Sequence, residues 1–314
     1  MATNPGYHTA SPEVIDAVRD GILTWFNRHH RTLPWRETRD PYRILVSEVM
    51  LQQTQVDRVI PYYERFLERF PGVHELAAAP VADVIRLWAG LGYNRRAVNL
   101  QKAAQAVVEK HNGAFPRSFD KLRALPGVGE YTAGAIACFA FEQDIAFADT
   151  NMRRVLDRIF AGETDASWSS LAPLAGKLLP PGGGWKWNQA LMEFGALHCT
   201  SRKPLCGLCP LQMQCLSFPV AQQPGQRPPL KREEAFLGSN RYFRGRILAV
   251  LRDHPAGSVS LEELGIQVRD DFTSDQIPWL VDLVRGLESD GLARVAEVRD
   301  EYDASPVGTR VALP

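Results

Sequence analysis

The chain has 314 residues, and its 45% hydrophobic and 23% charged residues are ordinary for a globular protein with more than one core. Basic and acidic residues both total 36, so a DNA-binding surface would have to be local and balanced by acidic residues elsewhere. No apolar stretch approaches the length of a membrane span, and the polar residues 1–14 do not have the pattern of a signal peptide. We therefore expect a cytoplasmic protein with no membrane partner.

Most of residues 1–218 have the spacing of amphipathic helices. Apolar residues recur at intervals of three and four residues in Val14–Asn27, Arg43–Val56, Val81–Trp88, Arg96–Lys110 and Tyr131–Phe141. Proline and glycine separate these stretches, and no run of alternating strands interrupts them. The pattern predicts an all-α domain over residues 1–218.

The composition changes after this region. Residues 219–238 combine prolines with glutamines and charged residues, which is typical of a linker. Residues 239–314 then contain helical patterns around Phe243–Leu251, Leu261–Val268 and Ile277–Leu287, followed by two possible paired strands, Ala293–Val298 and Thr309–Leu313. This order predicts a small α+β domain of the winged-helix type. The polar side of its third helix is acidic, which favours packing or a protein partner over reading a DNA groove.

Four of the five cysteines lie within residues 199–215. Cys199, Cys206, Cys209 and Cys215 are separated by six, two and five residues, so their thiolates can close around one metal centre. Structural zinc sites more often use two close cysteine pairs, whereas a [4Fe–4S] cluster tolerates uneven spacing. The spacing predicts a metal centre and favours the iron–sulfur cluster.

A glycine-containing turn joins two helical stretches at residues 125–129. Gly127 and Gly129 flank Val128 and allow the backbone to turn tightly. The next helix begins near Thr132, and the free N–H groups at its start would form an anion site. The turn is consistent either with a helix-hairpin-helix grip on a DNA phosphate or with a plain interhelical turn.

Two carboxylates have the surroundings that glycosidic cleavage requires. Glu48 has mostly apolar neighbours on its helix, so its carboxyl group would hold a proton to higher pH and suit a general acid. Asp149 precedes the predicted helix Asn151–Phe160, whose terminus would keep it ionised. One group can protonate the leaving base while the other stabilises the sugar cation. Alternatively, Glu48 is an exposed glutamate and Asp149 is only a helix cap.

In combination, the hairpin, Asp149 and the cysteine loop resemble the helix-hairpin-helix DNA glycosylases that carry an iron–sulfur cluster. Within that superfamily the sequence is most similar to the MutY-type adenine glycosylases, which act on adenine opposite 8-oxoguanine. The matching segments are Leu33–Arg36, Pro41–Arg43, Ser47–Thr54, Trp88–Tyr93 and Asn188–Met192. The resemblance covers roughly residues 15–217 and implies a two-lobed helical domain with a [4Fe–4S] loop.

The resemblance also implies residue roles. Glu48 would protonate the departing base, and Asp149 would stabilise the sugar cation or its covalent adduct, with support from Tyr131 and Asn151. The remaining implied roles are DNA wedges at Gln53 and Tyr93, a base pocket lined by Trp35, Arg36 and Gln189, and phosphate contacts at Gly127, Val128, Gly129 and Thr132. The partner would be double-stranded DNA with a damaged or mispaired base, bound by a monomer.

Tyr131 stands where the bifunctional relatives have a nucleophilic lysine, and no lysine lies between Lys121 and Lys177. We therefore expect base removal without strand cleavage. Residues 239–314 do not resemble the Nudix-like domain with which MutY-type enzymes inspect 8-oxoguanine, so other targets stay open. These are thymine or uracil opposite guanine, and hypoxanthine. A non-enzymatic regulator, with a winged helix and a redox-active cluster, is a third hypothesis, which the Glu48 and Asp149 pair argues against.

Overall fold

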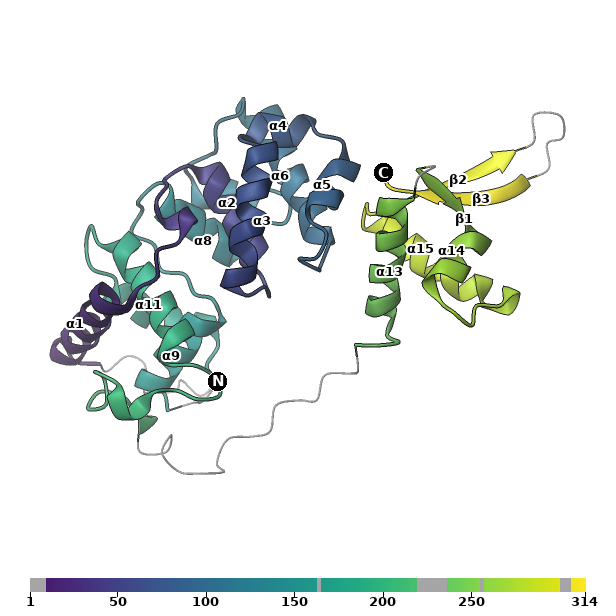
Figure 1. Cartoon of the computed structure of the whole chain (residues 1–314). Helices are drawn as coiled ribbons and strands as arrows, with labels where there is room; N and C mark the ends of the chain where they lie inside the picture. Colours follow the sequence, from purple (N-terminus) through teal and green to yellow (C-terminus); the bar gives the residue numbers. More distant parts are fainter. Residues whose placement is uncertain (1–9, 163–164, 219–235, 255–256, 300–305) are drawn as a thin grey trace. The chain divides into compact units, whose positions relative to one another are not determined.

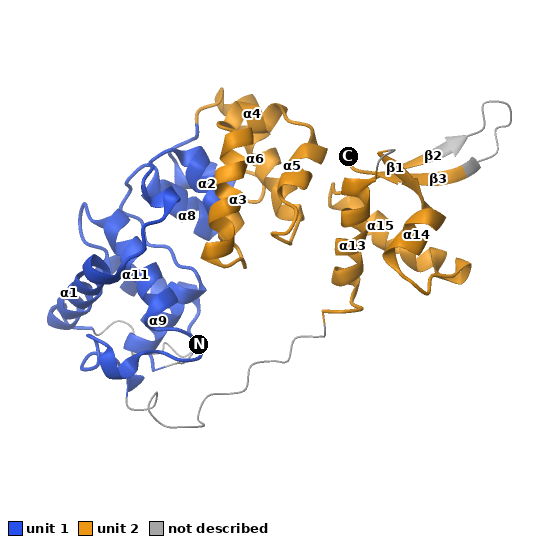
Figure 2. Ribbon diagram, viewed as in Figure 1, with its two compact units in different colours: residues 1–48, 115–124, 128–229 blue, residues 49–114, 125–127, 230–314 orange. Residues whose placement is uncertain are grey.

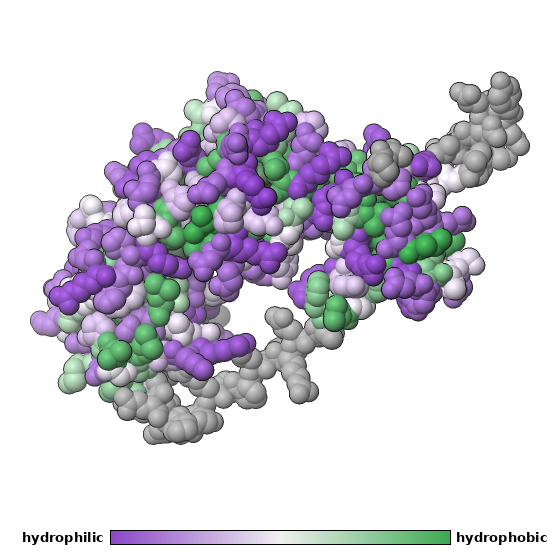
Figure 3. Space-filling view, in the orientation of Figure 1, coloured by the Kyte–Doolittle hydropathy of each residue, from purple (hydrophilic) through white to green (hydrophobic). Residues whose placement is uncertain are grey.

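The computed structural model describes residues 10–162, 165–218, 236–254, 257–299 and 306–314 (Figure 1). Most of the predicted linker and residues 1–9 of the polar N-terminal segment lie outside these ranges. Contacts divide the chain into unit 1, residues 1–48, 115–124 and 128–229, and unit 2, residues 49–114, 125–127 and 230–314 (Figure 2). Within the described ranges, no helix is both long and apolar enough to cross a bilayer. Hydrophilic residues cover most of the face seen in Figure 3.

Unit 1 is built from helices, and α1, α9, α10 and α11 share an apolar core. Its helices are α1 (Pro12–His29), most of α2 (Pro41–Leu51), α7 (Phe119–Arg123), α8 (Glu130–Phe139), α9 (Thr150–Phe160), α10 (Trp168–Leu178) and α11 (Gly184–Leu197). Ser11 caps α1, and the buried Val18, Ile22 and Trp25 form the face of α1 that packs against α11. Short 3-10 turns lie at Pro34–Arg36 and Cys206–Leu208.

The first part of unit 2 consists of α3 (Val56–Arg69), α4 (Val73–Ala78), α5 (Val81–Leu87) and α6 (Arg95–His111). The side-chain amide of Gln101 in α6 donates hydrogen bonds to the carbonyls of Leu76 and Ala79, at 3.2 and 2.6 Å. These bonds satisfy carbonyl groups at the end of α4, and they fix the two helices together.

One predicted helix proved too long. The apolar spacing of Arg43–Val56 suggests a single helix, but α2 ends at Leu51 and Val56 is the first residue of α3. Gln53 lies between them with φ at +57°, in the left-handed region that ends a helix. The helical spacing of apolar residues therefore continues from α2 into α3, so it does not show that the helix is interrupted between them.

The C-terminal part of unit 2 contains α13 (Asn240–Asp253), β1 (Ser258–Ser260), α14 (Leu261–Val268), α15 (Ile277–Ser289), β2 (Arg294–Arg299) and β3 (Pro306–Ala312), with a 3-10 turn at Ser274–Gln276. The three predicted helices and the predicted strand pair are confirmed. The sequence did not predict β1, which has only three residues. The strands form an antiparallel sheet in the order β1–β3–β2, in which Val311 pairs with Val259 and Val295. The protein is therefore mostly helical, with one small sheet.

Candidate active site

Glu48 lies in α2 and is 5% exposed. Burial and, to a lesser extent, the charge of Asp149 raise the pKa of its carboxyl group to about 7, against the opposing effect of a hydrogen bond with Tyr131. Glu48 can therefore be protonated near neutral pH, as a general acid must be. The predicted desolvation of Glu48 is confirmed, and the exposed alternative is wrong.

Asp149 caps α9, as the sequence predicts. Its Oδ1 accepts a hydrogen bond from the Met152 N–H at 2.7 Å, and its Oδ2 accepts one from the Asn151 amide at 2.9 Å. Burial nevertheless raises the pKa of Asp149, although these hydrogen bonds lower it. The sequence predicted only the stabilising helix terminus, and it missed the opposing effect of burial.

Tyr131 forms a hydrogen bond with Glu48 and interacts electrostatically with Asp149. Burial raises the pKa of its hydroxyl group well above 10, and the negative charges of Glu48 and Asp149 add to the effect. The Tyr131 ring packs edge to face on Phe147, with centroids 5.6 Å apart. Phe147 can pack here because residue 134 is a glycine. A Cβ at Gly134 would lie only 2.7 Å from the Cβ of Phe147. The structure thus brings Glu48, Tyr131 and Asp149 together, and the phenol of Tyr131 is neutral.

Arg154, which the sequence analysis did not single out, joins this group to the cysteine loop. Its Nη2 donates to Asn151 Oδ1 at 2.9 Å and to the Gly195 carbonyl at 2.6 Å. Its Nε donates to the Cys199 carbonyl at 3.0 Å. Because Asn151 also donates to Asp149, hydrogen bonds connect the catalytic candidate continuously to the backbone of a cysteine. An arginine three residues after Asn151 lies on the same helix face, and that spacing was the available signal.

The three residues expected in the base pocket are all buried, and two of them contact each other. Arg36 Nε donates to Gln189 Oε1 at 2.8 Å, and Arg36 Nη2 donates to Glu193 Oε2 at 2.9 Å. Arg31 forms two further side-chain hydrogen bonds to Glu193, at 2.9 and 2.8 Å. Because Arg36 can only donate, Gln189 Oε1 must face it, which fixes the orientation of the amide. Trp35 is 7% exposed.

Glu193 is a second residue that the sequence analysis missed. Burial alone would raise the pKa of its carboxyl group, but the hydrogen bonds and charge of Arg31 and Arg36 hold that pKa at about 2. Glu193 is therefore ionised and fixes Arg36, which in turn orients Gln189. Its position four residues after Gln189 puts both on one face of α11, and this spacing could have revealed it.

The hairpin at residues 125–129 has the geometry of an anion site. Gly127 has φ at +73°, and a Cβ there would lie 2.7 Å from the Cβ of Asn99. Val128 is buried and anchors the turn, whereas Gly129 is exposed and starts α8 without a side-chain cap. The N–H groups of the first turn of α8 are therefore available to a phosphate. The Thr132 side chain is 2% exposed, so a contact by its hydroxyl group is not supported.

The two expected wedge residues both lie in unit 2 on exposed loops. Gln53 follows the end of α2, and Tyr93 precedes α6. Tyr93 is 48% exposed and has φ at +46°, so its backbone is left-handed like that of Gln53. Tyr93 is therefore not a core aromatic residue, and Gln53 is also exposed.

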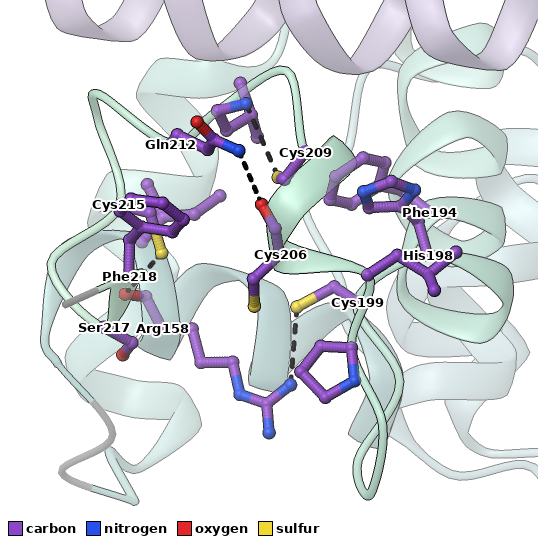
Figure 4. A pocket seen from close by; sticks show the side chains of 14 residues that line it. Arg158, Phe194, His198, Cys199, Cys206, Cys209, Gln212, Cys215, Ser217 and Phe218 are labelled. Carbon is purple, nitrogen blue, oxygen red and sulfur yellow. Dashed lines mark hydrogen bonds between the residues drawn. The ribbon is translucent and has the colours of Figure 1, made fainter. Parts of the chain in front are cut away.

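The four clustered cysteines line one cavity, together with Arg158 and His198 (Figure 4). None of them is in a disulfide. Arg158 Nη1 donates to Cys199 Sγ at 3.5 Å, and the Leu211 N–H donates to Cys209 Sγ at 3.5 Å. Such donors stabilise thiolate ligands, and the charge of Arg158 offsets an anionic cluster. The donor set therefore fits an iron–sulfur cluster. The fifth cysteine, Cys138, is fully buried in α8.

Comparisons with known proteins agree with this geometry. Residues 46–181 match the HhH-GPD superfamily of base excision DNA repair proteins, and residues 199–215 match the iron–sulfur binding domain of endonuclease III. An adenine DNA glycosylase of Mycobacterium tuberculosis (strain ATCC 25618 / H37Rv) is 43% identical over 240 residues, which cover 74% of this chain and 77% of the relative.

Solved structures give the same assignment at the level of the fold. A thermostable thymine-DNA glycosylase has a TM-score of 0.63 and 32% identity, over 66% of this chain and 98% of that one. An endonuclease III trapped in a covalent DNA complex has a TM-score of 0.62 and 26% identity, over 68% of this chain and all 100% of that one.

The buried Glu48, the helix-capping Asp149 and the hairpin lie within residues 46–181, and the four clustered cysteines lie within residues 199–215. These are the two segments that match the family models. The protein is a DNA glycosylase that acts in base excision repair, and it carries a [4Fe–4S] cluster. The chain belongs to the HhH-GPD superfamily and, within it, to the adenine DNA glycosylases.

Proposed function

We propose that this protein excises adenine mispaired with 8-oxoguanine or guanine, using Glu48 as the general acid and Asp149 as the stabiliser of the sugar cation. The observation that carries the proposal is the interaction of the buried Glu48, whose pKa is raised to about 7, with Tyr131 and Asp149. The names of the most similar relatives support adenine as the target base.

The proposed reaction separates the base from the sugar by hydrolysis of the C1′–N bond. Glu48 gives its proton to the departing base as the C1′–N bond breaks, and the bond's electron pair leaves with the base. The positive charge left on the sugar lies beside the Asp149 carboxylate, which Asn151 holds in place. Addition of water at C1′, with loss of its proton, completes the hydrolysis and leaves an abasic site.

Residue 131 is a tyrosine and not a lysine, so no amine is available at this position to attack the sugar. We therefore assign the protein base removal without strand cleavage. The base pocket would be formed by Trp35 and by the fixed amide of Gln189, with Arg36 acting through Gln189.

The DNA contacts outside the pocket follow from position and exposure. Gln53 and Tyr93 would enter the duplex where the base leaves, and the start of α8 with Gly127, Val128 and Gly129 would hold a backbone phosphate. We propose that the protein acts as a monomer on double-stranded DNA. Cys199, Cys206, Cys209 and Cys215 would be the cluster ligands, and the cluster would supply local rigidity to the loop they form.

We assign residues 1–218 to the glycosylase domain, 219–238 to a linker and 239–314 to a winged-helix domain. The last assignment is supported by the element order of α13, β1, α14 and α15 followed by the β2–β3 hairpin. Two acidic residues of α15, Asp282 and Glu288, are exposed. Negative charge there favours a packing or protein-binding role over insertion into a DNA groove.

A second candidate is removal of thymine or uracil opposite guanine, or of hypoxanthine, because the chain is also similar to a thymine-DNA glycosylase. A non-enzymatic regulator is not favoured, because the matching relatives are named as enzymes. Duplexes carrying each base opposite guanine and opposite 8-oxoguanine separate these functions when abasic sites are revealed with alkali. Preferential cleavage at adenine opposite 8-oxoguanine supports the proposal, and cleavage confined to thymine or uracil opposite guanine rejects it.

A further inference from the structure

Arg96, near the start of α6, is a buried arginine that the proposed chemistry does not use. It is only 9% exposed. Burial lowers the pKa of its guanidinium to about 10, so it remains a cation at neutral pH. Within unit 2 its side chain reaches two separate loops, one after α2 and one before α6.

The first of these segments is the C-terminal end of α2 together with the loop that follows it. Arg96 Nη1 donates hydrogen bonds to the carbonyls of Val49 at 2.8 Å, Met50 at 3.0 Å and Gln52 at 2.5 Å. The last carbonyls of a helix have no partner within the helix, and the negative end of its dipole favours a cation. Arg96 Nη2 also donates to Thr54 Oγ1 at 3.2 Å. Gln53 therefore lies between two residues that the same guanidinium holds.

The second loop is the turn before α6. Arg96 Nη2 donates to the carbonyls of Leu91 at 3.2 Å and Gly92 at 3.1 Å. The indole N–H of Trp88 donates to the Gly92 carbonyl as well, at 3.2 Å. The guanidinium carbon lies 5.6 Å from the centroid of the Tyr93 ring. Tyr93 is therefore held both through the preceding backbone and through its ring.

Gln53 and Tyr93 share an unfavourable backbone conformation. Both have positive φ, at +57° and +46°, which is disfavoured for residues with a Cβ. Such a conformation persists where surrounding contacts hold it, and here both loops are held by the same side chain. The two exposed side chains thus project from loops that Arg96 joins.

We infer that Arg96 is a positioning residue that fixes Gln53 and Tyr93 as one unit for insertion into the DNA duplex. This inference rests on the proposed function, since the insertion belongs to flipping of the target base. A planar guanidinium is required, because a lysine ammonium has three donors on one atom and cannot bridge two sets of carbonyls in the same way.

The test compares Arg96→Lys with wild type on two substrates, in single-turnover assays. One is a duplex with adenine paired opposite 8-oxoguanine, and the other carries adenine in an unpaired bulge, which needs less help to leave the stack. We expect the rate on the paired duplex to fall about 10- to 100-fold, as for a mispositioned group, while the rate on the bulge changes less than about threefold. Equal losses on both substrates would overturn the inference. The control is Arg95→Met, which removes a neighbouring but 67% exposed arginine side chain of α6.

A double-mutant cycle distinguishes a loss of positioning from general damage to the fold. If Arg96 acts through the wedge residues, Arg96→Lys should add less than about a twofold loss in a Gln53→Ala, Tyr93→Ala background. Additive losses would contradict the inference. The fluorescence of 2-aminopurine placed as the target base reports insertion without excision, in a Glu48→Gln background. Arg96→Lys should reduce the fluorescence rise on binding, and an unchanged rise would count against it. A wild-type protein that excises no adenine from either substrate would refute the proposed function instead.

Discussion

Replacing Glu193 with glutamine removes the negative charge between the guanidinium groups of Arg31 and Arg36. The Glu193 side chain is 2% exposed and that of Arg36 is 5% exposed, so solvent screens this pair little. Lowering the pKa of Glu193 from 4.5 to about 2 corresponds to about 3 kcal/mol of stability, at about 1.4 kcal/mol per tenfold change in proton affinity. Loss of one partner of a buried pair has a similar expected cost, of about 3–5 kcal/mol.

The sign of the pH dependence follows from the lowered pKa. The stabilisation is fully present above pH 4.5 and is lost as the pH falls toward 2, because the folded carboxylate is then protonated. Urea unfolding at several pH values should therefore show Glu193→Gln less stable than wild type by about 3 kcal/mol at pH 7, with the difference shrinking as the pH falls below 4.5. A difference that is absent at neutral pH, or that does not change with pH, would refute this account of the network.

A matched control is available in the exposed pair of Arg39 and Glu142. These side chains are 44% and 66% exposed, and their atoms approach to 2.9 Å. Glu142→Gln should change the free energy of unfolding by less than about 1 kcal/mol, because exposed ion pairs contribute little. Glu193→Gln should also slow excision, since Arg36 would no longer be held against Gln189.

Three further predictions concern the chemistry. Because burial raises the pKa of Glu48 to about 7, the single-turnover excision rate should fall about tenfold per unit above that pH, and a rate that keeps rising with pH above 7 would contradict the role of Glu48. Arg154→Leu should slow excision about tenfold or more and lower the iron content of the purified protein, since Arg154 joins Asn151 to Cys199; normal values of both would contradict this link. Borohydride should trap no stoichiometric covalent adduct with substrate DNA, and a stoichiometric adduct would show an amine nucleophile elsewhere in the chain.

The burial of Glu48 and the helix cap at Asp149 could be predicted because their surroundings are local in the sequence. The apolar neighbours of Glu48 lie within one turn of the same helix, and Asp149 directly precedes the helix that it caps. The cysteine loop is local for the same reason, since its four thiols lie within residues 199–215. In each case, short-range spacing contains most of the information.

The positioning residues could not be found in this way. Arg96 acts on carbonyl groups more than 40 residues away, and Glu193 pairs with Arg31 from the opposite end of the domain sequence. Their partners are set by tertiary packing, which apolar periodicity does not describe. The same limit applies to the break between α2 and α3, where a left-handed Gln53 ends a helix although the apolar pattern continues to Val56.

In the proposed mechanism, adenine release depends on a proton supplied by Glu48. The most direct measurement is the single-turnover rate of adenine release from an adenine–8-oxoguanine duplex, for wild type and for Glu48→Gln, with folding checked by thermal melting. The account predicts that the substitution abolishes release, while the variant melts no lower than wild type at pH 7, because a buried carboxyl group that would otherwise ionise has been removed. A Glu48→Gln protein that releases adenine at the wild-type rate would contradict it.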